Sequence, residues 1–113
     1  MVKKSIFPLL VCIMACLAFC TTAKKVQVQY IPITYEAHVK PLIVTKCAPC
    51  HLDDGKEVSY DNYKSAKENI NDIIRRIKLN PEQHGFMPEK GPKLPDSLIH
   101  VFEQWNTDSL LQK

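Results

Sequence analysis

The most informative segment of the chain is Cys47-Ala48-Pro49-Cys50-His51, two thiols separated by two residues and followed directly by an imidazole. The pattern C-x-x-C-H is the attachment signature of c-type haem. Two intervening residues let both sulfurs reach neighbouring edges of one porphyrin and form thioethers, while the next residue can place its imidazole on the iron. The sequence therefore predicts one covalently bound haem c, with Cys47 and Cys50 as attachments and His51 as the proximal iron ligand.

Two other kinds of site use short cysteine and histidine strings. Structural zinc usually takes four ligands, and the chain after residue 23 contains no second cysteine pair. A thioredoxin-like redox pair lies at the end of a strand and opens a helix, and no strand-rich surroundings are evident here. Haem attachment is therefore favoured over zinc binding and over thiol redox chemistry.

The sixth iron position is assigned to Met87, the one methionine after the N-terminal segment. It lies in Gly85-Phe86-Met87-Pro88, where glycine and proline shape the backbone. A thioether ligand favours ferrous iron and raises the reduction potential. His84 is the alternative ligand, which gives a bis-histidine site of lower potential, whereas His38 and His100 are expected on the surface of helices.

The segments on either side of the motif predict helices. Thr34 is expected to cap a helix that runs toward Cys47 and is kinked at Pro41. A second helical stretch is expected around 62–68, with Asp61 as its cap. Together with helical patterns over 70–77 and 96–111, these segments predict an all-α fold.

The strongest helical periodicity lies in the second half of the chain. Isoleucines follow the i, i+3, i+4, i+7 rule at Ile70, Ile73, Ile74 and Ile77. A last helix is expected from about Asp96 to Leu111, with one apolar stripe formed by Leu98, Ile99, Phe102 and Trp105. Trp105, Arg75 and Arg76 are candidate partners for haem propionates, with a plain core position and an exposed helical face as the alternatives.

The N-terminal segment reads as an export signal. Lys3 and Lys4 precede an apolar run over 6–19, and the small residues Thr21-Thr22-Ala23 offer a cleavage site. The run is shorter than the ~20 residues that a membrane-spanning helix needs. The expected organisation is a signal segment over 1–23, a tether over 24–33 and one domain over 34–113.

The cysteines of the signal segment leave a second interpretation open. Cys12, Cys16 and Cys20 lie within it, and Cys16 and Cys20 each follow an aliphatic residue by three positions, as in a lipoprotein signal. A lipidated Cys16 or Cys20 would tether the domain to a membrane. Both interpretations place the domain outside the cytoplasm, in the periplasm of a bacterium.

The charge of the chain indicates no nucleic-acid partner. Fifteen basic residues against 12 acidic ones give a formal net charge of +3, which is slight and dispersed. A local group of lysines flanks the expected haem-bearing loops and is predicted to form a docking ring for an acidic redox partner. Its members are Lys46, Lys56, Lys90 and Lys93.

The order of these features resembles a small single-haem bacterial cytochrome c of class I. The resemblance covers about residues 34–111. Val39-Lys40-Pro41-Leu42 before the motif and Met87-Pro88 after it are similar to segments of exported cytochrome domains common in Bacteroidota. The resemblance implies a compact all-α cytochrome c-like fold, in which the first and last helices cross and haem occupies the cleft. Many relatives hold the proximal imidazole with the carbonyl of a proline after the motif, and no proline follows His51 before Pro81.

The function that this resemblance implies is electron transfer. We expect an exported monohaem cytochrome that passes single electrons between donor and acceptor proteins and is not an enzyme. A haem-based ligand-binding or sensor module with a labile sixth position is the alternative. A small peroxidase would need distal acid and base groups, for which His84 is the one candidate.

Overall fold

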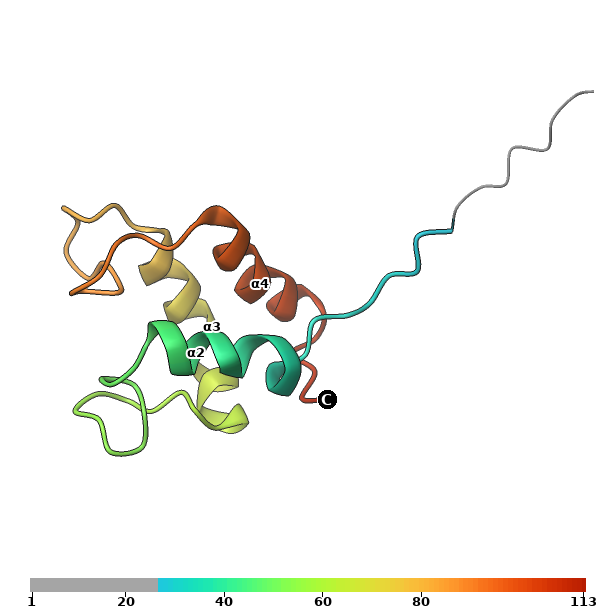
Figure 1. Ribbon diagram of the computed structural model, residues 1–113, viewed down its shortest axis with the longest axis horizontal. Helices are drawn as coiled ribbons and strands as arrows, with labels where there is room; N and C mark the ends of the chain where they lie inside the picture. The colour runs from blue at the N-terminus through green and yellow to red at the C-terminus, as the bar shows by residue number, and fades with distance from the viewer. Residues whose placement is uncertain (1–26) are drawn as a thin grey trace, which may run out of the picture.

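The computed structural model describes residues 27–113, and in this part the regular elements are helical (Figure 1). In chain order they are η2 (Tyr35–Val39), α2 (Lys40–Lys46), α3 (Tyr63–Lys78) and α4 (Asp96–Thr107). No strand occurs among residues 27–113, which confirms the all-α class. Residues 1–26 lie outside the described part, so export and lipidation at Cys16 or Cys20 stay predictions.

The helix before the cysteine motif changes its geometry next to Pro41. η2 is a π-helical turn in which the Lys40 N–H donates to the carbonyl of Tyr35, and α2 then continues in regular α geometry with Pro41 in its first turn. Proline has no N–H to donate, and its ring collides with the carbonyl four residues earlier in a regular helix. A wider turn before Pro41 relieves that collision, which confirms the expected irregularity at this residue.

The C-terminal segment caps the first helix. Thr34 occupies the cap position, but its side chain makes no capping hydrogen bond, so the predicted role of its hydroxyl is wrong. The free N–H groups of Tyr35 and Glu36 donate instead to the carbonyl oxygens of Leu111 (2.9 Å) and Gln112 (3.1 Å). The two ends of the domain are thereby joined by backbone hydrogen bonds.

α3 is one continuous helix that unites the two predicted stretches. Its cap is Asn62, whose side chain accepts from the Ser65 N–H at 2.9 Å. Asp61, the predicted cap, accepts from the hydroxyl of Ser59 instead, so that prediction was one residue off. The inner face of α3 is formed by Ala66, Ile70, Ile73 and Ile77, while Ile74 is partly buried beside them.

α4 ends at Thr107, four residues before the predicted end at Leu111. Ser109 and Leu110 have φ values of 64° and 57°, in the left-handed region that ends a helix. The Leu110 N–H then donates to the Trp105 carbonyl at 3.0 Å. The final residues therefore turn back toward the start of the domain.

An aromatic group joins the first helix to the last. The ring of Tyr35 lies 5.7 Å from that of Trp105 and 5.8 Å from that of Tyr63 on α3. Tyr35 and Trp105 are fully buried. The Trp105 indole N–H donates to the Leu111 carbonyl at 2.8 Å, so Trp105 is a core residue and its N–H is already used within the protein.

Residues 27–33, the described part of the expected tether, are extended and approach the end of α4. The Tyr30 hydroxyl and the Ile33 N–H both donate to the Asp108 carboxylate, the latter at 2.6 Å. The Tyr30 contact lowers the pKa of Asp108. Among residues 27–113 no helix is long and apolar enough to cross a membrane.

The helices leave two long loops on one side of the domain. One connects α2 to α3 and the other connects α3 to α4, and in Figure 1 both project at the left, away from the C terminus. The first carries Cys47, Cys50 and His51, and the second carries Met87. The fold therefore presents all four predicted site residues from the same side.

Candidate functional site

The cysteine motif begins where α2 ends. Cys47 is the C-cap of α2, with its N–H bonded to the Ile43 carbonyl at 2.8 Å, and the His51 N–H donates to the Cys47 carbonyl at 3.1 Å. This turn fixes the backbone across the whole motif. Both thiols are free: Cys47 is half-buried against the core, and Cys50 is exposed.

The position of Cys47 disfavours a thiolate. Burial raises the pKa of its thiol to about 11. The carbonyl end of a helix also carries partial negative charge, whereas reactive thiols are found at helix N-termini or beside cations. Cys47 is therefore protonated at neutral pH and lacks the activation that thiol redox chemistry requires.

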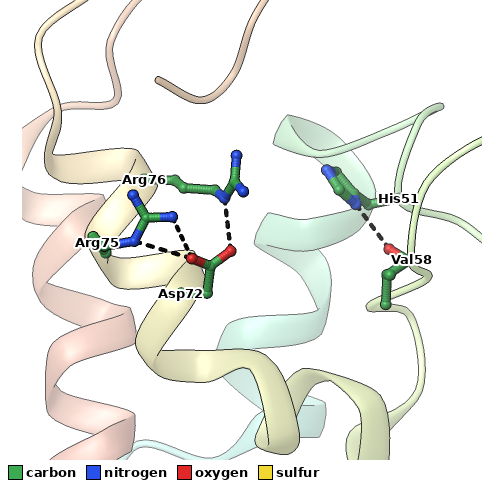
Figure 2. A network of polar contacts seen from close by, with 5 residues as sticks. All are labelled: His51, Val58, Asp72, Arg75 and Arg76. Atoms are coloured by element: carbon green, nitrogen blue, oxygen red, sulfur yellow. Dashed lines mark hydrogen bonds and ion pairs between the residues drawn. The ribbon is translucent and has the colours of Figure 1, made fainter. Parts of the chain in front are cut away.

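The imidazole of His51 is held through one of its two ring nitrogens. Its Nδ1 atom lies 2.8 Å from the carbonyl oxygen of Val58. Figure 2 draws this contact as a dashed line. A carbonyl can only accept, so Nδ1 carries the proton and donates it. In the neutral imidazole, Nε2 is then the nitrogen without a proton, and a neutral ring is the form in which histidine binds a metal.

The loop after the motif folds back against it. The Glu57 N–H donates to the Cys50 carbonyl at 3.1 Å, and the Gly55 N–H donates to the Leu52 carbonyl at 2.8 Å. A Cβ atom at Gly55 would collide with the carbonyl oxygens of Cys50 and Pro49, the latter at 2.6 Å. Glycine at position 55 therefore allows the close backbone contact that shapes the motif.

Met87 lies on a loop that is bonded to α3. Its N–H donates to the Arg76 carbonyl at 3.3 Å, and its side chain is partly buried against the core. Gly85 has a φ of 88°, a conformation that favours glycine, and Phe86 beside it is buried. His84, the alternative iron ligand, is exposed.

The two arginines of α3 both bind Asp72. Arg76 Nε donates to one oxygen of Asp72 at 2.6 Å, and Arg75 Nε donates to the other at 3.0 Å. These hydrogen bonds lower the pKa of Asp72, and the one from Arg76 has a larger effect than the one from Arg75. Figure 2 shows the guanidinium of Arg76 and the ring of His51 pointing toward one another, whereas Arg75 lies on the outer side of the pair.

The predicted docking lysines are not all free. Lys46, Lys56 and Lys90 are exposed. Lys93 is half-buried, and its ammonium group lies 3.2 Å from the Lys78 carbonyl and 3.3 Å from Oδ1 of Asn80. Lys93 therefore stabilises the end of α3 in addition to adding positive charge.

The site also contains residues that sequence reasoning missed. Val58 supplies the carbonyl for His51, and Tyr60 stacks on the imidazole with ring centroids 4.5 Å apart. Any residue type can offer a carbonyl, so no sequence signal marks Val58. Tyr60 lies nine positions after His51 and three before Tyr63, and nothing in the sequence distinguishes it from Tyr63 as a partner of His51.

The residues that the structure describes contain no group of three or more His, Cys, Asp or Glu side chains placed to hold one metal ion. A four-ligand zinc site at Cys47 and Cys50 would require such a group. Haem requires from these residue types only the two thiols and one imidazole, because the porphyrin supplies the other nitrogens. The donor set of the loop therefore fits haem.

Comparison of the chain with protein-family models, with curated proteins and with solved structures gives no match.

Proposed function

We propose that this protein is an exported monohaem c-type cytochrome that carries single electrons between redox proteins. Cys47 and Cys50 would hold the haem by thioether bonds, His51 would bind the iron on one side and Met87 on the other. The observation that carries the proposal is the hydrogen bond from His51 Nδ1 to the Val58 carbonyl, 2.8 Å long. It leaves Nε2 free on a histidine that directly follows a C-x-x-C pair.

The chain's own residues account for the requirements of such a site. When bound, haem supplies an iron that gains and loses one electron. Val58 holds the imidazole in the metal-binding tautomer, and the Arg76 carbonyl holds the Met87 backbone at 3.3 Å. Val58 and the Arg76 carbonyl would thus hold the imidazole and the methionine loop in place before haem binds, which would keep rearrangement small when an electron is gained or lost and suits electron transfer.

The helical architecture supports the same proposal at the level of fold. The first helical stretch packs against α4 through Tyr35 and Trp105, and the motif follows directly after that stretch. A cytochrome c-like fold has this order: a helix, the attachment motif, further helices, a methionine loop and a terminal helix that packs on the first. We propose this fold family for the domain, with haem between the two long loops.

The test is covalent haem attachment in cells that contain haem-maturation machinery. The proposal predicts that haem stays with the chain on a denaturing gel, and that Cys47→Ser with Cys50→Ser abolishes this signal. His51→Ala should retain covalent haem and lose the low-spin spectrum. His100→Ala is the matched control, because His100 lies on the exposed side of α4 with 69% of its side chain accessible, and it should behave as the parent protein.

Absence of haem from the parent protein under these conditions would contradict the proposal. Haem that is attached but binds carbon monoxide rapidly after reduction would instead favour the ligand-binding or sensor module, since the sixth position would then be labile.

A further inference from the structure

The segment from Val58 to Tyr60 contacts His51 in three ways. The Val58 carbonyl accepts from Nδ1, and the Tyr60 N–H donates to the His51 carbonyl at 2.9 Å. The rings of Tyr60 and His51 are stacked, with 13° between their planes and 4.5 Å between their centroids. Backbone, ring face and ring nitrogen of His51 are therefore all fixed by the same short segment.

Tyr60 is in turn fixed by the core. Its side chain is 9% exposed, and its carbonyl accepts from the hydroxyl of Tyr35 at 2.8 Å. Tyr35 is fully buried in η2 and packs against Tyr63 and Trp105. A continuous series of contacts thus runs from the rigid aromatic group to the predicted iron ligand.

We infer that Tyr60 is a positioning residue for His51, and that the Tyr35 hydroxyl holds Tyr60 in that role. The stacked ring restricts rotation of the imidazole, and the Val58 carbonyl fixes its tautomer, so the two contacts together set the direction of Nε2. A hydrogen-bond acceptor such as the Val58 carbonyl raises the basicity of a ligating imidazole, and loss of such an acceptor typically weakens metal binding by about 10-fold to 100-fold. The inference rests on the proposed function, because it concerns His51 as an iron ligand.

The test compares haem-bearing variants by two measurements that report on His51 and the iron, with the melting temperature measured beside them. NMR gives the rate at which the Nδ1–H proton of His51 exchanges with solvent, and a redox titration gives the midpoint potential. Tyr60→Leu removes the stacked ring, Tyr60→Phe keeps it, and Tyr35→Phe removes only the hydroxyl that bonds to the Tyr60 carbonyl. Phe102→Leu is the matched control, because it removes a buried aromatic ring of α4 that lies outside the group of Tyr35, Tyr63 and Trp105.

The inference predicts that Tyr60→Leu accelerates Nδ1–H exchange and raises the midpoint potential, because a less basic imidazole stabilises ferric iron less. Tyr35→Phe should move both quantities in the same direction by a smaller amount. Tyr60→Phe should leave both unchanged, and Phe102→Leu should lower the melting temperature without changing the exchange rate.

Two results overturn the inference in distinguishable ways. If the parent protein carries haem and Tyr60→Leu and Tyr35→Phe both match it in exchange rate and potential, the positioning role is wrong and the proposed function stands. If the parent protein carries no haem, the proposed function is contradicted and the inference falls with it.

Discussion

The backbone N–H of Tyr35 donates to the carbonyl oxygen of Leu111 at 2.9 Å, and the indole N–H of Trp105 donates to that same oxygen at 2.8 Å. One carbonyl near the C terminus therefore serves the start of the first helix and the largest core side chain together. The Thr34 side chain makes no capping hydrogen bond, so the start of this helix is capped by a segment far away in the sequence.

Removal of residues 111–113 should therefore destabilise the domain strongly, although only three residues are lost. The truncation leaves the N–H groups of Tyr35, Glu36 and Trp105 without their acceptors. We expect a loss of about 2–4 kcal/mol in the free energy of unfolding, measured with urea. Removal of Lys113 alone is the control and should change it by less than about 0.5 kcal/mol; equal stability of the two truncated chains would refute the capping role.

Gly55 offers a sharp test of the loop that follows the cysteine motif. Gly55→Ala places a methyl group against the Cys50 and Pro49 carbonyl oxygens, so the loop must move. We expect a loss of about 2 kcal/mol or more in stability and a lower yield of haem-bearing protein. Gly91→Ala is the control, since its Cβ would meet Pro88 at an ordinary 3.5 Å, and the account fails if both variants behave alike.

The start of α3 depends on Asn62. Asn62→Ala removes the side-chain oxygen that accepts from the Ser65 N–H at 2.9 Å. The expected cost is about 1 kcal/mol in the free energy of unfolding, whereas Asn62→Gly should cost only a few tenths. Chemical denaturation of the two variants checks this, and a Gly variant less stable than the Ala variant would show that the cap is not what stabilises the helix start.

Asp72 should contribute to the loss of stability in acid. Its pKa is lowered by Arg76 and Arg75, so its contribution is present above the unfolded pKa of about 3.9 and is lost as pH falls through the lower folded value. Melting temperatures measured between about pH 5 and pH 2.5 should fall less steeply in Asp72→Asn than in the parent protein. Asp54→Asn, at an exposed loop position, is the charge-matched control and should keep the parent slope; the same slope in Asp72→Asn would contradict the ion pair's role.

The helices were predictable wherever the pattern of apolar residues was local. The isoleucines of α3 and the stripe on α4 are repeated at helical spacing, and burial of Ile70, Ile73 and Ile77 confirms the predicted face. Helix ends were less predictable, because tertiary contacts decide them. α4 ends at Thr107, and the chain then turns back, so that the Leu111 carbonyl accepts hydrogen bonds from Trp105 and Tyr35.

The sequence was sufficient to predict the side chains that would bind haem, but not the groups that hold those side chains in position. Cys47, Cys50 and His51 are marked by their residue types and spacing. The partner of His51 is a backbone carbonyl, which any residue at position 58 would offer, so its identity came only from the structure. For Arg75 and Arg76 the sequence left a propionate partner and an exposed helical face open, and the structure adds that both donate to Asp72, so the propionate role stays a prediction.

Haem binding by this protein is tested most simply by the optical spectrum, oxidised and reduced, of protein produced with haem-maturation machinery. We predict c-type bands and a weak band near 700 nm, which marks methionine bound to ferric iron. The near-infrared band should disappear in Met87→Ala and remain in His84→Ala. A spectrum without haem bands would contradict the account, and a 700 nm band that survives Met87→Ala would contradict the assignment of the sixth ligand.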